Sequence, residues 1–202
     1  HGLPHDPFKA IVAPRPIGWI STLDAAGRPN LAPYSFFNAV HSEPPMLAFT
    51  SESMKHSAAN AIATGEFVFN LSTRPLFEAM NISSGTLPAG ESEFVAAGLA
   101  MAPGRMVRAP RVAATPAALE CKVVSSAQLR DIEDRPLEGW IIIGQVVGVH
   151  IDEAYLRDGR FDTAAAQALA RCGYRDYAVV AEVFEALRPS DSGAYVAGQP
   201  DR

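Results

Sequence analysis

The sequence predicts a mainly β domain, a mostly antiparallel, barrel-like sheet decorated with short helices. At least seven segments rich in β-branched and aromatic residues are separated by turns that contain Gly or Pro. These segments do not alternate with long helices, as they would in a doubly wound parallel sheet. In one of the two strongest segments, Trp140–Ile151, Gly144 and Gly148 interrupt a β-branched run. Glycines inside a strand mark bulges, bends or a close backbone approach, which is typical of a strand that curves around a small closed sheet.

The first strands contain the most informative stretch of the chain. Ile17–Leu23 is rich in β-formers, and an Asp-Ala-Ala-Gly turn signal joins it to a strand over Asn30–Phe37. A connection that contains Pro leads to the next strand, Pro45–Ser51. Upstream, the Pro-Arg-Pro at 14–16 keeps the chain extended and directs Arg15. We interpret this arginine either as a surface guanidinium or as a functional one.

The positions of Pro and Gly, together with the spacing of apolar residues, predict the remaining elements. Ser57 is expected to cap a short helix over Ala58–Thr64, which Gly65 ends in a left-handed conformation. A long excursion rich in Gly and Pro covers residues 83–118. The other expected elements are strands over Glu66–Ser72, Leu119–Leu129 and Trp140–Ile151, helices over Pro75–Ile82, Glu91–Ala97 and Thr163–Arg171, and β structure over Tyr174–Val180 and Ala181–Leu187.

Composition limits the class of protein. The chain has 202 residues, of which 48% are hydrophobic and 19% charged, as in a globular protein with a full core. A net charge of −5 without any Lys/Arg run argues against binding to nucleic acid. No apolar run approaches the roughly 20 residues that span a bilayer, so no membrane association is expected. Cys121 and Cys172 form no C-x-x-C pair, and the start has no signal-peptide pattern, so we expect reduced thiols and a cytoplasmic location.

Polar side chains crowd the junction between the third strand and the helix that follows it. The hydroxyls of Thr50, Ser51, Ser53 and Ser57 and the ammonium of Lys55 all fall within eight residues. Free N–H groups and the positive end of the helix dipole favour a bound phosphate at such a junction. An ordinary capped helix start explains the same hydroxyls.

Just upstream, aromatic and polar residues alternate at the end of a strand. Ser35, Phe36, Phe37 and Asn38 can cover a flat ring and hydrogen-bond its edge. Adjacent residues of a strand point to opposite faces, so one of the two phenylalanines is expected in the core. A phosphate seat beside an aromatic-amide shelf suits flavin mononucleotide (FMN).

Other catalytic and cofactor motifs are absent from the sequence. There is no G-x-G-x-x-G after a strand, no Walker loop, no G-x-S-x-G and no H-E-x-x-H, and the histidines lack partners at metal-ligand spacing. An enzyme of this sequence would therefore depend on an organic cofactor, and no metal is expected. His150 could orient a nicotinamide or balance the charge of a reduced flavin, or it could be a satisfied edge-strand histidine. Gly173 and Tyr174 could approach a ring system or form a plain turn.

The residues resemble the flavin reductase-like family, whose members include flavoredoxin and the FMN reductase components of two-component oxygenases. The resemblance extends over roughly residues 8 to 188, so we expect one domain over 1–202 with a frayed C-terminal tail. Its motifs, in order, are Pro14-Arg-Pro-Ile17, Ser21-Thr22, Gly27-Arg-Pro-Asn30-Leu-Ala-Pro-Tyr-Ser-Phe-Phe-Asn38, Pro44-Pro45, Asn60, Ile62, Thr64-Gly-Glu-Phe-Val68, Asn70-Leu71, Glu78-Ala-Met-Asn81, Glu93-Phe94, Ala97-Gly-Leu99, Pro110-Arg-Val112, Leu119-Glu-Cys121, Gly144, Val147 and His150-Ile151.

The resemblance implies an FMN-binding split β-barrel with Greek-key-like antiparallel order, and a homodimer that holds FMN noncovalently near its interface. Carried over by position, His150 would lie near the ring or the nicotinamide, and Tyr174 near the cofactor. The flavin contacts implied by the resemblance are Asn30, Ser35, Phe36, Phe37 and Asn38 at the ring and ribityl, and Thr50, Ser51, Lys55 and Ser57 at the ribityl and phosphate.

Two functions follow from this resemblance. The first is an NAD(P)H-dependent flavin reductase, which takes hydride from a transient nicotinamide donor and passes electrons to free flavin, a partner oxygenase or another acceptor. The second is an FMN-binding electron carrier or sensor without NAD(P)H turnover.

Overall fold

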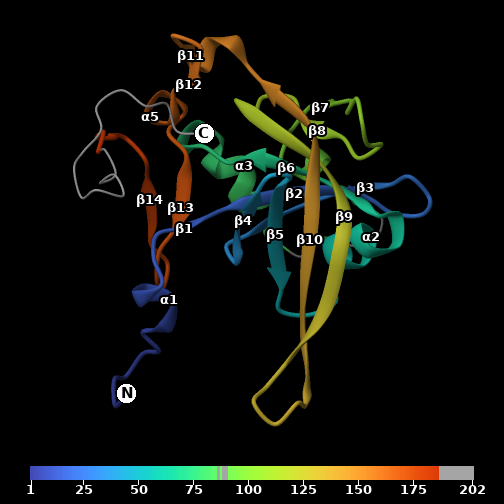
Figure 1. Cartoon of the computed structure of the whole chain (residues 1–202), viewed down its shortest axis with the longest axis vertical. Helices are drawn as coiled ribbons and strands as arrows, with labels where there is room; N and C mark the ends of the chain where they lie inside the picture. Colours follow the sequence, from blue (N-terminus) through green and yellow to red (C-terminus); the bar gives the residue numbers. More distant parts are fainter. Residues whose placement is uncertain (86, 88–90, 187–202) are drawn as a thin grey trace.

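Seven antiparallel strands form the main sheet of the computed structural model, which describes residues 1–85, 87 and 91–186 (Figure 1). Their order across the sheet is β3-β2-β6-β9-β10-β5-β4. Their bounds are β2 (Gly18–Leu23), β3 (Pro29–Tyr34), β4 (Phe37–Ser42), β5 (Pro45–Ser51), β6 (Glu66–Leu71), β9 (Ala117–Arg130) and β10 (Pro136–Ile151). The predicted mainly β, antiparallel class is confirmed.

Short elements surround this sheet. The smaller sheets pair β1 (Arg15–Pro16) with β13 (Leu169–Arg171) and β14 (Tyr177–Val179), β7 (Met101–Ala102) with β8 (Arg111–Val112), and β11 (Leu156–Arg157) with β12 (Arg160–Phe161). The helices are α1 (Phe8–Ile11), α2 (His56–Thr64), α3 (Phe77–Ile82), α4 (Glu93–Ala96) and α5 (Thr163–Ala166), with 3₁₀ turns at Arg74–Leu76 and Glu153–Tyr155. Within the described residues, no helix is both long and apolar enough to cross a membrane.

Both faces of β2 are buried, which divides the core into two clusters. Trp19 and Ile20 are neighbours in this strand and therefore point to opposite sides, and neither is exposed. Ile20 packs with a cluster that includes Phe49 and residues of α2. Trp19 packs with a cluster that includes Met80 of α3. The helices thus cover the sheet because each face of its central strands is apolar.

The strand expected over Asn30–Phe37 is divided by a bend. β3 ends at Tyr34, the chain bends at 35–36, and β4 runs from Phe37 to pair with β5. The ring of Phe37 turns into the core and stacks on Phe69 at a centroid distance of 4.8 Å. A Cβ at Gly18 would lie 2.4 Å from the Phe37 ring, so that inward turn requires the glycine. The prediction of one continuous strand was wrong because alternation alone does not reveal where a strand changes partner.

The C-terminal elements also differ from the prediction. The helix expected over Thr163–Arg171 ends at Ala166, where Gln167 adopts a left-handed conformation with φ 51°. Leu169–Arg171 instead forms β13 against β1. The second β segment expected at 181–187 is not a strand over residues 181–186. Residue 187 and the tail expected to fray lie outside the described residues.

The β9–β10 hairpin extends well beyond the body of the protein (Figure 1). As expected from its glycines, β10 has register shifts next to Gly144 and Gly148. A Cβ at Gly144 would lie 2.4 Å from the Phe67 ring, so this glycine permits close packing at the hairpin base. The outer half of the hairpin is exposed, and Ile132 at its tip is 98% exposed.

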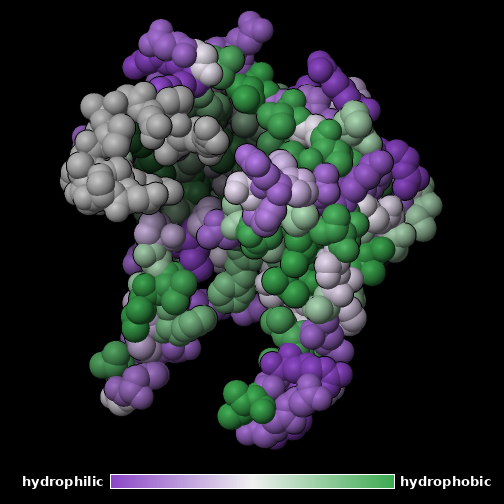
Figure 2. Space-filling view, viewed as in Figure 1, coloured by the Kyte–Doolittle hydropathy of each residue, from purple (hydrophilic) through white to green (hydrophobic). Residues whose placement is uncertain are grey.

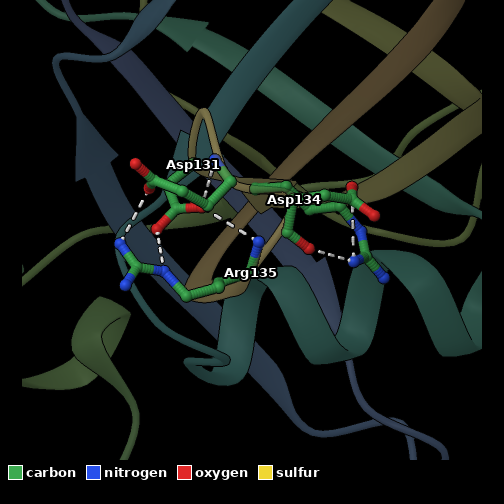
Figure 3. A network of polar contacts seen from close by, with 5 residues as sticks. Asp131, Asp134 and Arg135 are labelled. Atoms are coloured by element: carbon green, nitrogen blue, oxygen red, sulfur yellow. Dashed lines mark hydrogen bonds and ion pairs between the residues drawn. The ribbon is translucent and has the colours of Figure 1, made fainter.

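A polar network closes the tip of this hairpin (Figure 3). Asp131 accepts hydrogen bonds from the backbone N–H of Glu133 and Arg135 at 3.0 and 2.9 Å, and its other oxygen lies 2.6 Å from Arg135 Nε. The backbone hydrogen bond from Arg135 is the main reason that the pKa of Asp131 is lowered. The acidic cluster around Asp131 is therefore a network that closes the turn.

Candidate functional site

A cleft of about 520 Å³ opens between the N-terminal segment and the bend that joins β3 to β4. Residues 11–16 form one wall, and Ser35–Asn38 form the other, with Thr50 of β5 at the side. A cavity of this size is typical of small-molecule and cofactor sites. The structure therefore brings the predicted aromatic-amide shelf and one of the predicted hydroxyls into a single cavity.

The two phenylalanines of the shelf have different environments. Both rings are partly buried: Phe37 packs against the core cluster, whereas Phe36 has Lys9 Nζ 5.3 Å from the centroid of its ring. Phe36 directly precedes β4. Its backbone is held next to β5, because its carbonyl accepts a hydrogen bond from the N–H of Thr50 at 2.8 Å. Both phenylalanines line the cleft, and Phe37 also supports the bend through its contact with the core.

Asn30, Ser51 and Ser57 form a buried polar cluster that does not line the cleft. Asn30 Nδ2 donates to Ser57 Oγ at 2.8 Å, and Ser51 Oγ donates to the carbonyl of Ser53 at 2.6 Å. All three side chains are buried. Burial raises the pKa of Tyr34, against the lowering effect of hydrogen bonds with Ser57 and Ser51. This cluster holds β3, β5 and the start of α2 in a fixed arrangement.

The helix start differs from the predicted one. α2 begins at His56, and Lys55 occupies the N-cap position without a side-chain capping bond. Ser57 was predicted as the cap, which is wrong, because its hydroxyl points into the buried cluster instead. Lys55 is exposed, and Gly65 ends the helix at φ 73° as expected. The predicted phosphate residues therefore lie in different places. Thr50 lines the cleft, Ser57 points into the interior, and Lys55 is exposed to solvent.

Arg15 anchors the N-terminal wall of the cleft and is only 6% exposed. Its guanidinium donates to the carbonyls of Lys9, Val12 and, at 2.9 Å, Cys172. The surface interpretation of Arg15 is therefore wrong. The sequence signal was the pair of flanking prolines, which restrict the backbone around Arg15.

Residues 12–165 match the family model of the flavin reductase like domain. The chain belongs to this family. A relative from Deinococcus radiodurans, described only as an uncharacterized protein, is 38% identical over 191 residues, covering 88% of this chain and 81% of the relative.

Solved structures show the same architecture as this flavin reductase-like chain. Nitrilotriacetate monooxygenase component B from Bacillus cereus is 30% identical with a TM-score of 0.83, covering 89% of this chain and 90% of that one. The 2-nitrobenzoate 2-nitroreductase NbaA from Pseudomonas fluorescens is 25% identical with a TM-score of 0.80, covering 95% and 92%. A protein from Shewanella frigidimarina, described as a flavin reductase with a split barrel domain, is 23% identical with a TM-score of 0.80, covering 90% and 89%. The split-barrel fold expected from the sequence is confirmed.

In this flavin reductase-like chain, His150 lies apart from the cleft. Its Nε2 is 2.5 Å from Oε1 of Glu120, a fully buried carboxylate that also accepts the N–H groups of Arg105, Met106 and Val107. Burial alone would raise the pKa of Glu120, but these hydrogen bonds outweigh it and lower the pKa to about 2. Within one chain, the structure therefore places His150 where it can hold the loop at 105–107, not where it can contact the cleft.

Sequence reasoning missed Glu120 as a partner of His150. A carboxylate inside an apolar strand was the available signal, because a buried charge needs compensation. Its partner could not be identified, because three register shifts separate Glu120 from the start of the hairpin pairing.

Tyr174 lies beside the cleft in an adjoining cavity, which shares Arg15 and Ser35 with it. Its backbone is left-handed at φ 54°, and its side chain is 57% exposed. The preceding Gly173 contacts the N-terminal helix closely, since a Cβ there would lie 2.4 Å from Ala10 Cβ. The glycine thus allows the chain to fold against α1, the helix next to the cleft wall.

The described residues contain no group of three or more His, Cys, Asp or Glu side chains that could hold a metal ion. Cys121 is buried, and burial, with a smaller effect of the Glu120 charge, raises the pKa of its thiol to about 12. A thiol with that pKa is protonated at neutral pH and is a poor nucleophile.

Proposed function

We propose that this chain is an FMN-binding flavoprotein oxidoreductase, an NAD(P)H-dependent flavin reductase that passes electrons to free flavin or to a partner protein. The observation that carries the proposal is that a single cleft is lined by Phe36, by the polar residues Ser35 and Asn38 beside it, and by Thr50. This combination of an aromatic ring with hydroxyl and amide groups suits a flat, hydrogen-bonding heterocycle. Membership of the flavin reductase like family supports the same choice.

Each part of the proposed cofactor has a matching part of the site. Phe36 would pack against the isoalloxazine, while Ser35 and Asn38 would hydrogen-bond its edge. Thr50 would contact the ribityl chain, and Lys55 with the start of α2 would hold the phosphate. Asn30, Ser51 and Ser57 would act indirectly, because their buried hydrogen bonds position β3, β5 and α2.

When bound, the flavin supplies a two-electron acceptor for hydride, which no side chain of the chain can supply. The residues of the cleft would hold the donor and the ring in contact and exclude water. The N–H groups and cations near the cleft would favour negative charge on the ring. His150 would have a positioning role through Glu120 and the loop at 105–107.

We further propose a cytoplasmic homodimer. The N-terminal segment and the hairpin form separate projections from the body, and hydrophobic residues cover much of the body beside the hairpin base (Figure 2). Val40 on edge strand β4 and Val124 on the hairpin are 49% and 50% exposed. A second copy would cover such side chains. The likeness to a monooxygenase component supports an oxygenase as one candidate electron acceptor.

The decisive experiment begins with an absorption spectrum of the purified protein and identification of the released chromophore. The flavin-loaded protein is then mixed anaerobically with NADH or NADPH in a stopped-flow instrument. For a reductase, the visible flavin absorbance should disappear at least as fast as the enzyme turns over. If FMN is bound but neither donor bleaches it, the chain is an electron carrier or sensor instead. A protein that takes up no FMN would exclude both functions.

A further inference from the structure

Two arginines lie directly opposite each other in the small sheet beside the cleft. Arg15 of β1 pairs with Arg171 of β13 in antiparallel register. Opposite residues in such a pair send their side chains to the same face, and like charges in this arrangement destabilise the pairing. Both side chains line the cavity of about 310 Å³ that adjoins the proposed flavin cleft. The fold thus concentrates positive charge next to its proposed site of chemistry.

Both guanidinium groups contact only uncharged partners in their hydrogen bonds and ring contacts. Arg15 donates only to backbone carbonyls, and its buried Nε has no hydrogen-bond partner. Arg171 donates to the carbonyl of Tyr174 at 2.8 Å and lies over the ring of Tyr177, 4.3 Å from its centroid. Among the salt bridges of the described residues, none involves Arg15 or Arg171. Neither guanidinium therefore forms an ion pair with a described carboxylate.

A buried cation without a counter-charge is costly, so the arrangement favours an anion between the two arginines. Lys9 lines the same cavity as a third cation, while its own salt bridge to Glu52, at 3.3 Å, lies among exposed side chains. Three cations suit a doubly charged group better than a single carboxylate. The planar fork of arginine also matches the geometry of phosphate oxygens.

We propose that the cavity between Arg15 and Arg171 binds a phosphate group of a molecule that occupies the adjoining cleft. The two cavities share Arg15 and Ser35, so one molecule can extend from one to the other. Because the flavin phosphate is proposed to lie at Lys55 and the start of α2, the phosphate between the arginines belongs to a pyridine nucleotide that meets the flavin, and the phosphate of the flavin itself is the alternative that the test distinguishes. Only this choice of molecule rests on the function proposed above; the phosphate site itself rests on the arginine pair.

The test uses Arg171→Gln, with Arg175→Gln as the matched control. Arg175 lies four residues after Arg171, is exposed and does not line the cavity. Arg175→Gln therefore changes the net charge by the same amount without altering the proposed site. Arg171→Lys retains the charge without the fork. Circular dichroism and the thermal midpoint establish that each variant is folded.

Two measurements distinguish the sources of the phosphate. Inorganic phosphate is titrated into the flavin-loaded protein at constant ionic strength, with calorimetry as the readout. Retention of FMN and of riboflavin through dilution and desalting is then compared for each variant. If the phosphate belongs to the nucleotide, the parent binds inorganic phosphate, and Arg171→Gln weakens that binding about tenfold. If it belongs to the flavin, Arg171→Gln loses FMN about tenfold more readily, with riboflavin unchanged.

In either case Arg171→Lys should recover part of the loss, and Arg175→Gln should match the parent. The proposal is overturned if Arg171→Gln stays within twofold of Arg175→Gln in both measurements. If Arg171→Gln does not fold, Arg171→Lys decides, since the loss of the fork should still weaken phosphate or FMN binding severalfold. Failure of NAD(P)H to reduce the flavin would overturn the reductase function but not the phosphate site. Inorganic phosphate can be titrated whether or not flavin is bound.

Discussion

His150 and Glu120 meet inside the base of the β9–β10 hairpin, with His150 Nε2 2.5 Å from Glu120 Oε1. The two residues are 30 positions apart and lie on paired strands. Glu120 also accepts three consecutive backbone N–H groups from the loop at 105–107. One buried carboxylate therefore connects the hairpin to the loop that packs over it.

Glu120→Gln should destabilise the protein by about 2–3 kcal/mol, because an amide accepts weaker hydrogen bonds than a carboxylate and its NH₂ cannot replace the lost acceptor. Urea denaturation of parent and variant measures this difference. His150→Gln should cost less, since Glu120 keeps its backbone donors. Flavin affinity should change little in both variants, because neither residue lines the cleft. A large loss of flavin with unchanged stability would contradict this positioning role.

The free energy of unfolding should decrease at low pH, over a pH range that the pKa of Glu120 sets. The folded-state pKa of Glu120, about 2, lies below its ordinary value of 4.5. The protonated form is thus disfavoured in the folded state, and the stabilisation is full above pH 4.5 and is lost as the pH falls toward 2. A shift of that size corresponds to at most about 3 kcal/mol. Urea midpoints measured across this range should show a slope for the parent that Glu120→Gln reduces; equal slopes would contradict the prediction.

Phe36→Ala and Phe37→Ala should have opposite effects. Phe37 packs against the core and stacks on Phe69, so its truncation should cost about 3 kcal/mol of stability, the low end for a phenylalanine because it is only partly buried. Phe36 lines the cleft, so its truncation should leave stability nearly unchanged while weakening flavin binding about tenfold, from lost ring contact. Thermal denaturation and fluorescence titration with FMN check the two effects. The reverse pattern would mean that the cleft wall has been assigned to the wrong phenylalanine.

Gly173→Ala should disturb the cleft from a distance. The new methyl group would lie 2.4 Å from Ala10 Cβ and 2.5 Å from Ala10 Cα, so helix α1 must move. Overpacking of this kind costs about 1–3 kcal/mol. Because α1 leads into the wall at 11–16, flavin retention should also fall. The thermal midpoint of the variant measures the cost of this overpacking separately from flavin retention. Retention equal to that of the parent would show that the wall does not depend on the contact.

Lys55→Ala should weaken FMN binding by a few kcal/mol at most, as expected for one charge-assisted phosphate contact. Riboflavin binding should be unchanged, and stability should be nearly unchanged because Lys55 is exposed and makes no capping bond. Retention of both flavins through desalting measures the difference. If Lys55→Ala retains FMN as well as the parent while Arg171→Gln does not, the flavin phosphate lies between the arginines instead of at the start of α2.

Local patterns were sufficient to predict the class of fold and most strands. β-branched and aromatic residues marked β2, β6, β9 and β10, and the glycines of β10 correctly indicated irregular register. The missed elements were those stabilised by distant contacts. β13 has only three residues and no strong strand signal, and it exists because it pairs with Arg15 and Pro16.

The sequence by itself determined the mainly β class, the family resemblance and the segment that forms one wall of the cleft, because these depend on neighbouring residues. The tertiary structure alone decided which distant side chains meet. Strand register places Arg15 opposite Arg171 and brings His150 within reach of Glu120 on the neighbouring strand. The packing of α2 turns Ser57 inward and leaves Lys55 exposed. Register depends on the packing of the whole sheet, since a slip of one residue would reverse the face of every side chain in a strand.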